Sequence, residues 1–341
     1  MSPDVSILVP VYNVARFIEK CSVSLFEQSL KNIEYIFMDD CSPDNSIDIL
    51  RSVIARYPER ADRVSILRQD RNRGLAAARN TLIEHATGQY ILHVDSDDYL
   101  EKECAEILLR KAEEEHADIV ISDIFREKAS GTVVQQVRFS PDKTAYINLV
   151  LSSQSPSYNC GKLIKTALYR EHAIWCKEGV NVLEDYHTLP RLAYYAQKIV
   201  KVDVPLYHYI QFNENAYTKN CNEKFIRNVC EAIEVVETFF SAVEDADKYA
   251  RSISAFKIMT KINNMKHADR QLQKSIIELF PEIDSIDSKD VIRLSSLDDL
   301  LYRLIRQKQA FLIYLLTNAL DKATSIKQQL KKTILIQEVN R

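Results

Sequence analysis

The stretch Gly88 to Leu100, GQYILHVDSDDYL, is an apolar run that ends abruptly in three acids, Asp95, Asp97 and Asp98. The run predicts a strand over residues 89–94 with the carboxylates at its C-terminal end. Ligands of open α/β sheets bind beyond the carboxyl ends of strands, and crowded carboxylates repel one another unless a cation joins them. Mn²⁺ or Mg²⁺ takes carboxylate oxygens and shares its other positions with substrate phosphates. The stretch therefore predicts a metal-dependent, diphosphate-handling site.

A structural reading of the same acids stays open. Asp98, followed three residues later by Glu101, has the spacing of a capping box, in which side chains bond the free N–H groups at a helix start. One acid suffices for a cap, whereas this stretch has three. The metal site is therefore the prediction that we carry forward.

Strands and helices are predicted to alternate before this stretch. Apolar runs rich in β-branched residues, each followed by a segment with helical spacing, lie at Val5–Val11, Ile33–Met38 and Val64–Leu67. This alternation predicts a parallel sheet with right-handed crossovers. A strand over residues 118–123 and a turn at Ser130-Gly131 predict a hairpin, so the fold class is α/β with a mixed sheet flanked by helices.

Two domains are predicted. Residues 1–219 form the α/β domain, in which residues 141–201 are predicted to be helical and two strands follow at 198–204 and 206–210. Residues 220–341 form an α-helical C-terminal domain, because the sequence there has no glycine, a single proline and amphipathic helical patterns.

Composition limits the classes of function. The 341 residues are 46% apolar, and the net charge of -3 gives no basic face for nucleic acid. Seven cysteines without C-x-x-C spacing predict reduced thiols in a cytoplasmic protein, and the N-terminus lacks a signal-peptide pattern. The apolar run Ala310–Leu316 is far shorter than the roughly 20 residues that span a membrane, so any membrane contact is expected to be peripheral.

Further candidate residues follow the other strands. Pro10, Val11 and Tyr12 end the first run, Asp40 ends the second, and Arg79 lies on the helix after the basic turn RQDRNRG. A tyrosine can stack on a nucleobase, a carboxylate can accept from a base N–H, and an arginine can neutralise phosphate. Singly, each residue also fits ordinary packing or a solvated surface. Together, they predict a nucleotide-diphosphate site at one sheet edge.

Four segments in this order, VSILVPVYN, FMDDCSPDNS, NRGLAAARN and ATGQYILHVDSDDYL, resemble the inverting nucleotide-sugar glycosyltransferases of family 2, which have the GT-A fold. The resemblance covers roughly residues 4–215. Within the family, the chain is most similar in type to bacterial members that build cell-surface polysaccharides. The resemblance implies a donor half over residues 1–100 and an acceptor half over 101–219. It also implies that Asp97 and Asp98 bind the metal. The residues placed on the donor nucleotide are Pro10, Val11, Tyr12, Asp40, Arg79, Asp95 and Ser96.

The segment NVLEDYHTLPRL, residues 181–192, resembles the part of the family that supplies the catalytic base, which implies that Asp185 takes the proton of the acceptor hydroxyl. The alternative is that Glu184 and Asp185 are helix-start acids that complement the helix dipole. The family's Q-x-x-R-W acceptor motif lacks its Gln and Trp here, which favours addition of a single sugar over a processive polymerase.

The predicted function is metal-dependent transfer of a sugar from a nucleotide sugar, with UDP as the expected nucleotide, to a saccharide acceptor in capsule, exopolysaccharide or lipopolysaccharide assembly. One alternative is a non-catalytic binding module that has kept the fold. The other is a sugar-phosphate nucleotidylyltransferase, which needs a glycine-rich phosphate loop, whereas no glycine precedes Gly74.

The C-terminal 41 residues are basic. They contain eight Lys or Arg and two acids, with apolar residues at roughly helical spacing. This pattern fits peripheral contact with an anionic membrane, where a lipid-linked saccharide acceptor would lie. Packing of the same apolar face on the catalytic domain or on a second subunit, as in a homo-oligomer, stays open. The basic residues are Arg303, Arg306, Lys308, Lys322, Lys327, Lys331, Lys332 and Arg341.

Overall fold

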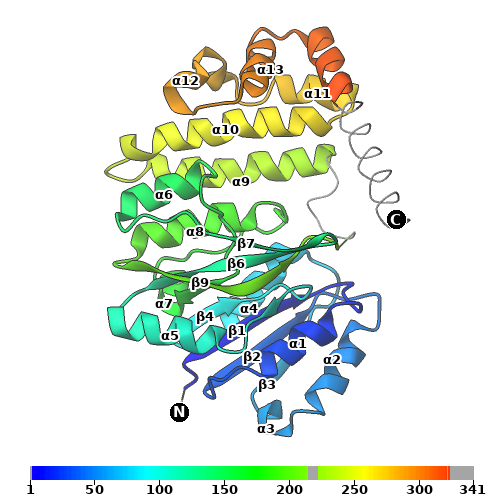
Figure 1. Ribbon diagram of the computed structural model, residues 1–341, viewed down its shortest axis with the longest axis vertical. Helices are drawn as coiled ribbons and strands as arrows, with labels where there is room; N and C mark the ends of the chain where they lie inside the picture. Colours follow the sequence, from blue (N-terminus) through cyan, green and yellow to red (C-terminus); the bar gives the residue numbers. More distant parts are fainter. Residues whose placement is uncertain (1, 214–221, 321, 323–341) are drawn as a thin grey trace, which may run out of the picture. The chain divides into compact units, whose positions relative to one another are not determined.

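The structure is a computed structural model that describes residues 2–213, 222–320 and 322. The described residues within 1–219 and 228–249 form one compact unit, and those within 220–227 and 250–341 form a second. The first unit is built on a mixed sheet with flanking helices, and the second is helical (Figure 1). The predicted fold class is therefore confirmed.

The part of the first unit that leads to the acids alternates strands and helices as predicted. In chain order these are β1 (Val5–Val11), α1 (Ile18–Phe26), β2 (Ile33–Asp39), α2 (Ser46–Ile54), α3 (Pro58–Ala61), β3 (Val64–Arg68), α4 (Leu75–His85) and β4 (Tyr90–His93). β2 and β4 pair with β1 in parallel on its two sides, and β3 pairs in parallel with β2. The carboxyl ends of the four strands therefore meet at one edge, and the strand order reverses between β1 and β4, where open α/β sheets bind ligands.

The remaining elements of the sheet half are β5 (Tyr99–Leu100), α5 (Cys104–Glu115), β6 (Ile119–Lys128), β7 (Gly131–Gln135), α6 (Lys143–Leu151), β8 (Lys162–Lys165), α7 (Thr166–Glu171), α8 (Glu184–Tyr195) and β9 (Ile199–Ile210). β8 is antiparallel to both β4 and β6, while β9 is parallel to β6 and antiparallel to β5. β6 and β7 form the hairpin expected at Ser130-Gly131. The second half of the sheet is therefore mixed, as predicted.

Two details differ from the sequence prediction. The two strands expected at 198–204 and 206–210 are one strand, β9, in which Pro205 lies opposite Asp123 where the register with β6 shifts. Proline has no N–H for the ladder, and an irregular register accommodates it. β8 is a strand inside the region that we predicted to be helical. Its short sequence KLIK has lysine at both ends and no extended apolar signal.

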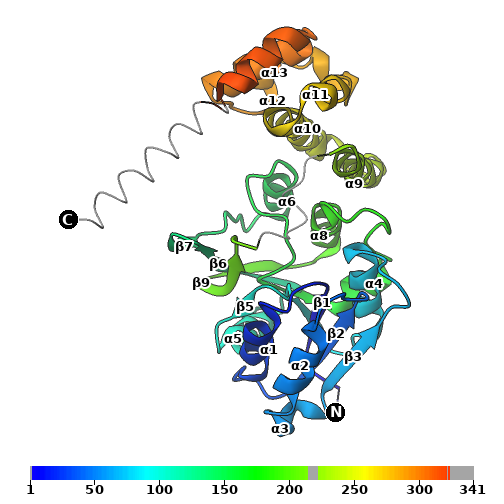
Figure 2. The ribbon, with the colours of Figure 1, turned by 90° about the vertical axis from the view of Figure 1, so that its right-hand side faces the viewer.

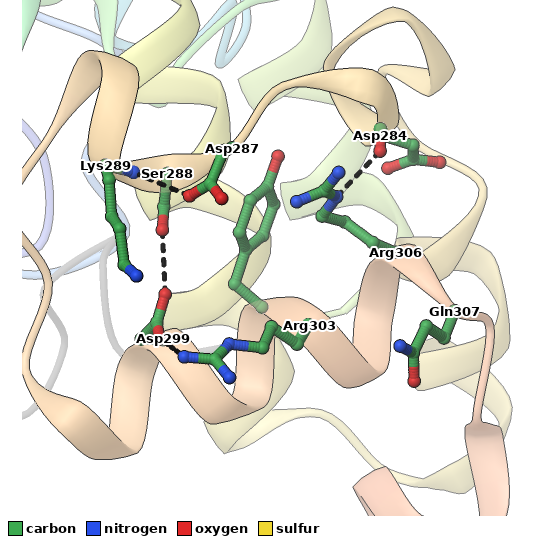
Figure 3. Close-up of a pocket in the computed structure, with 9 residues that line it drawn as sticks. Asp284, Asp287, Ser288, Lys289, Asp299, Arg303, Arg306 and Gln307 are labelled. Carbon is green, nitrogen blue, oxygen red and sulfur yellow. Dashed lines mark hydrogen bonds and ion pairs between the residues drawn. The ribbon is translucent and has the colours of Figure 1, made fainter.

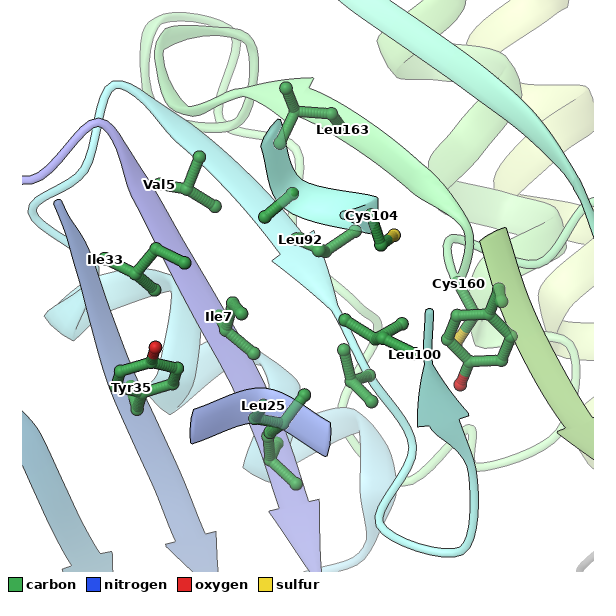
Figure 4. Close-up of a cluster of buried hydrophobic side chains, with 14 of the residues drawn as sticks. Val5, Ile7, Leu25, Ile33, Tyr35, Leu92, Leu100, Cys104, Cys160 and Leu163 are labelled. Atoms are coloured by element: carbon green, nitrogen blue, oxygen red, sulfur yellow. The ribbon is translucent and has the colours of Figure 1, made fainter. Parts of the chain in front are cut away.

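A buried apolar cluster joins the sheet to α1, α2 and α5. Figure 4 shows part of it, with Val5 and Ile7 of β1 beside Ile33 and Tyr35 of β2 and Leu92 of β4. α4 contacts β1 and β2 from the other face, opposite α1 (Figure 2). The strand ends are thus held between two helical layers, which fixes the side chains that follow them.

The helices after the sheet are α9 (Glu223–Ser241), α10 (Asp247–His267), α11 (Arg270–Ile277), the 3-10 helix η2 (Pro281–Ser285), α12 (Ser288–Val291) and α13 (Ser296–Arg306), and residues 310–320 are also helical. Asp269, Asp287 and Ser295 cap α11, α12 and α13 by accepting backbone N–H groups. Within the described ranges, no helix is both long enough and apolar enough to cross a membrane.

Candidate active site

Three predicted residues lie just beyond neighbouring strand ends. Tyr12 follows β1, Asp40 follows β2 and Asp95 comes two residues after β4. Tyr12 is 41% exposed, whereas Pro10 and Val11 before it are buried in the strand. The structure therefore brings the expected nucleotide residues to one sheet edge and leaves the Tyr12 ring accessible.

Asp40 is buried and fixes the start of α4. Its Oδ1 accepts the backbone N–H of Arg73 over 2.7 Å, and its Oδ2 accepts that of Gly74 over 2.8 Å. Burial raises the pKa of Asp40, and these two hydrogen bonds oppose that rise. Gly74 has φ +89°, and a Cβ there would lie 2.3 Å from Asn181 Nδ2. Only glycine fits at this junction, which explains the glycine in NRGLAAARN.

The turn of acids after β4 is held by the end of β9. Asp98 is buried; its Oδ1 accepts the backbone N–H of Ile210, and its Oδ2 accepts the hydroxyl of Tyr207, each over 2.7 Å. The backbone N–H of Asp95 donates to the same hydroxyl over 3.1 Å. Asn213 Nδ2 donates to Asp97 Oδ2 over 2.8 Å. One strand end thus sets the orientation of the whole acidic turn.

The acids of this turn are electrostatically crowded. Burial, and then the charge of Asp95, raises the pKa of Asp97 to about 6. Burial and the charges of Asp97 and Asp95 raise the pKa of Asp98 well above its usual value. Such repulsion is relieved when a cation binds nearby. Ser96, between these acids, is buried.

Arg79 lies at the centre of the site. Its side chain is 2% exposed, and its guanidinium is 3.1 Å from Asp95 Oδ1, 3.4 Å from Glu184 Oε1 and 3.2 Å from Asp185 Oδ1. Asn159 Nδ2 donates to the same oxygen of Asp185 over 2.7 Å. Asp185, predicted as the base from the second half of the chain, therefore lies in one cluster with an acid of the β4 turn.

Burial governs the protonation of this cluster. Burial lowers the pKa of Arg79, but the carboxylates outweigh it and hold that pKa well above its usual value. Burial raises the pKa of Asp185, while the charge of Arg79 opposes the rise. For Glu184, burial and the neighbouring Asp185 both raise the pKa. Arg79 thus favours the ionised form of both carboxyls, against the effect of burial.

Sequence reasoning missed four residues of the site. Asn159 contacts Asp185, Cys160 Sγ donates to Asp95 Oδ2 over 3.2 Å, and Tyr207 and Asn213 hold the acidic turn. Two of them lie in YNCGKLIK and two in PLYHYIQFN. Those segments carry polar residues beside strands, but their partners are 26 to 116 residues away in sequence.

No group of three or more His, Cys, Asp or Glu side chains in the described ranges is arranged to hold a metal ion by itself.

A separate pocket of about 440 Å³ lies within the second unit, among η2, α12 and α13 (Figure 3). Arg306 Nε donates to the backbone oxygen of Asp284 over 2.7 Å, Ser288 Oγ donates to Asp299 over 2.8 Å, and Arg303 forms an ion pair with Asp299. Charges of both signs line the pocket, and the contacts named above join α13 to η2 and to α12.

Comparisons with known proteins agree with this geometry. Residues 6–172 match the family described as Glycosyl transferase family 2. The chain is 27% identical to glycosyltransferase GlyG of Streptococcus pneumoniae over 304 residues, which are 85% of this chain and 94% of that protein. It is also 27% identical over 218 residues to poly(ribitol-phosphate) beta-N-acetylglucosaminyltransferase TarS of Staphylococcus aureus, 62% of this chain and 36% of TarS.

Solved structures show the same fold. The crystal structure of Staphylococcus aureus TarS 1–349 in complex with UDP-GlcNAc superposes with a TM-score of 0.70 at 20% identity, covering 94% of this chain and 92% of that one. The mannosyltransferase PcManGT of Pyrobaculum calidifontis, in complex with GDP-Man and Mn²⁺, superposes with a TM-score of 0.56 at 15% identity, covering 94% and 87%. Together with the family match and the named relatives, the acids at this sheet edge lead to one conclusion: residues 6–172 of the chain form a glycosyl transferase family 2 domain.

Proposed function

We propose that this glycosyltransferase moves a single sugar from a UDP sugar to a hydroxyl of a saccharide acceptor, with inversion and with a divalent metal. The observation that carries the proposal is the Arg79 cluster, in which Asp95 of the donor side and Asp185 of the acceptor side touch one guanidinium. The complexes of TarS with UDP and UDP-GlcNAc support UDP as the nucleotide.

The donor nucleotide lies along the carboxyl ends of β1, β2 and β4 in this proposal. The exposed ring of Tyr12 stacks on the base, and the buried backbone of Pro10 and Val11 lines the floor beneath it. Asp40 keeps lone pairs on both oxygens beyond its two backbone bonds, so it can accept from a base N–H. Asp95 and Ser96 face the ribose.

The residues present fit a divalent cation. Asp98 has a donor from the end of β9 on each oxygen, whereas Asp97 accepts the amide of Asn213 at Oδ2. Asp97 would therefore hold the ion directly, and Asp98 would orient the turn behind it. A divalent ion such as Mn²⁺ or Mg²⁺, if bound there, would neutralise negative charge on the diphosphate leaving group. The mannosyltransferase complex that contains Mn²⁺ supports the use of a divalent metal.

The transfer step uses Asp185. The acceptor oxygen forms a bond to the anomeric carbon as the bond from that carbon to the diphosphate oxygen breaks, and the electron pair leaves with the diphosphate. The hydroxyl proton moves to the carboxylate of Asp185, which Asn159 and Arg79 hold in place. Attack opposite the leaving group inverts the configuration.

The acceptor is a bacterial surface polysaccharide or its precursor. The name of TarS, a poly(ribitol-phosphate) beta-N-acetylglucosaminyltransferase, supports a polymeric acceptor for this chain. The segment that replaces the family's Q-x-x-R-W motif supports single addition. Its Arg191 Nη2 donates to the backbone oxygen of Trp175 over 2.8 Å and is thereby engaged within the protein.

A screen of nucleotide sugars tests this function. UDP-, GDP- and TDP-linked sugars are incubated with the chain, with and without Mn²⁺, and release of the nucleotide is measured. We expect hydrolysis of at least one UDP sugar that depends on the metal. Hydrolysis of no donor, with no thermal stabilisation by any of them, would leave the non-catalytic binding module as the better reading.

We also propose that the chain acts at the cytoplasmic face of the membrane through its C-terminal region. Phe311, Leu312 and Leu315 of the helical segment 310–320 are 64%, 46% and 49% exposed. Residues 301–320 contain three basic side chains and no acid, although Arg303 pairs with Asp299 and Lys308 with Glu278. Lys322 is exposed, and Lys327, Lys331, Lys332 and Arg341 lie outside the described residues. An apolar face with basic neighbours complements an anionic leaflet, at about 1 kcal/mol per basic residue.

Sedimentation with lipid vesicles tests this contact. The full chain should bind phosphatidylglycerol vesicles at low salt, bind more weakly at physiological salt, and ignore phosphatidylcholine vesicles. Triple replacement of Lys327, Lys331 and Lys332 by Glu should abolish the binding. Absence of binding at low salt contradicts the membrane contact, and a concentration-dependent dimer in its place would assign the face to a second copy.

A further inference from the structure

We infer that Arg79 is a positioning residue for the base Asp185, and that it does not contact the phosphates of the donor. The inference rests on the proposed function, because it concerns the proton transfer to Asp185. The basic turn before α4 makes a phosphate role the obvious reading of the sequence. The structure places the guanidinium elsewhere.

Burial is the first observation. The side chain of Arg79 is 2% exposed, so its guanidinium is closed off from the solvent-facing edge where a diphosphate would bind. By comparison, the side chain of Asp95 is 32% exposed and that of Asp185 is 14% exposed. The carboxylates therefore lie between the arginine and the open site, and a donor or acceptor meets them first.

The second observation is how the guanidinium spans the elements. It projects from α4, and it reaches one carboxylate after β4 and two at the start of α8. Asp95 and Asp185 are 90 residues apart in sequence, and no backbone hydrogen bond joins the turn after β4 to α8 among the described contacts. The arginine fork is planar and rigid, so it fixes the separation of the two carboxylates more tightly than a lysine can.

The third observation concerns the start of α8. Leu183, which precedes Glu184, has φ +61° in the left-handed region, and its side chain provides no cap for the helix. A non-glycine residue there persists only where the surroundings hold it. The ion pairs of Arg79 with Glu184 and Asp185, together with the Asn159 bond to Asp185, provide that hold.

Charge gives the fourth observation. Without Arg79, the carboxylates of Asp95, Glu184 and Asp185 would lose the one guanidinium that lies within 3.4 Å of all three. The charge of Lys162 also lowers the pKa of Asp185, but its Nζ donates to the backbone oxygen of Tyr158. An unpaired buried carboxyl protonates or turns toward water. In either case Asp185 would lose the ionised, fixed form that a base requires.

The test compares Arg79→Lys with a matched control, Arg60→Lys. Arg60 is also buried in the first unit, but it donates only to backbone oxygens, those of Phe26, Gln28, Leu30 and Lys31. Both variants lose a buried guanidinium, so both report the cost to folding. Hydrolysis of the UDP sugar found in the screen is measured with UDP affinity by calorimetry in Mn²⁺ and with thermal melting.

We expect Arg79→Lys to lower kcat by about 10- to 100-fold, the effect of a small misplacement of a catalytic group, with UDP affinity changed less than threefold. Arg60→Lys should keep the wild-type kcat, although its melting temperature should be similar to that of Arg79→Lys. In an Asp185→Asn background, Arg79→Lys should cause no further loss, because residues that act as a unit are not additive.

Three results would overturn the inference. If Arg79→Lys keeps the wild-type kcat, Arg79 does not position Asp185. A loss of UDP affinity as large as the loss of kcat returns Arg79 to the donor phosphates. Additive losses in the double variant show that Arg79 acts apart from Asp185. If the wild-type chain hydrolyses no nucleotide sugar, the proposed function is contradicted, and a crystal structure of Arg79→Lys tests the inference separately. A carboxylate of Asp185 that has not moved in that structure would contradict the inference.

Discussion

The hydroxyl of Tyr207 donates a hydrogen bond to Asp98 Oδ2 over 2.7 Å. The same hydroxyl accepts the backbone N–H of Asp95, so one oxygen joins both ends of the acidic turn. Removing it in Tyr207→Phe should weaken UDP binding in Mn²⁺ by about tenfold, or about 1.4 kcal/mol, because the turn loses its orientation. Calorimetric titration measures this.

Tyr90→Phe is the control for that variant. Tyr90 is buried in β4, and its hydroxyl donates to the backbone oxygen of Ala117 over 3.0 Å, away from the acids. Both changes remove one buried hydroxyl, so both should lower stability by about 0.5–1.5 kcal/mol or somewhat more for the bond to a charged group. Equal UDP affinity in the two variants would refute the role of Tyr207.

Asp97→Asn should remove metal-dependent binding of the donor. The amide keeps the shape of the side chain and loses the charge that attracts the ion. We expect UDP affinity in Mn²⁺ to fall to the value measured in EDTA, while Asp203→Asn, a change at an acid whose side chain is 91% exposed, keeps the metal effect. If Mn²⁺ still strengthens UDP binding to Asp97→Asn, another residue holds the ion.

Turnover should be lost at a higher pH than the pKa of an ordinary aspartate would predict. Burial raises the pKa of Asp185 above its usual value of about 3.9, and the base acts only when ionised. Therefore kcat should decline as pH falls through that raised value, while circular dichroism still shows a folded chain. A constant kcat down to pH 4 would mean that Asp185 is not the titrating base.

Gly74→Ala should lower the stability of the first unit more than Gly179→Ala. Both glycines have similar positive φ, +89° and +84°, but only at Gly74 would the new Cβ meet a side chain, that of Asn181. The backbone strain costs about 1–3 kcal/mol in each variant, and the collision adds to it at Gly74. Urea unfolding compares them, and equal midpoints would show that Asn181 moves away freely.

Local signals were enough to predict the first half of the site. Tyr12, Asp40 and Asp95 each follow an apolar run, and the parallel pairing of β1, β2 and β4 brings them together without further information. The same holds for the hairpin at Ser130-Gly131. Strand period and turn residues decide such features, and both can be read within about ten residues.

The rest of the site depends on pairing across the chain. Tyr207 reaches Asp98 because β9 pairs with β5 and β6, and Asn159 reaches Asp185 because β8 enters the sheet between β4 and β6. Nothing near these residues in sequence shows that contact.

The central claim is that Asp185 is the catalytic base, and substitution of Asp185 tests it most directly. UDP affinity in Mn²⁺ and hydrolysis of the UDP sugar are measured on the wild-type chain and on Asp185→Asn. We predict that the variant binds UDP as the wild type does and that its kcat falls by about a hundredfold to ten-thousandfold. Wild-type turnover in Asp185→Asn would contradict the account, and Glu184 would then be the next carboxyl to test as the base.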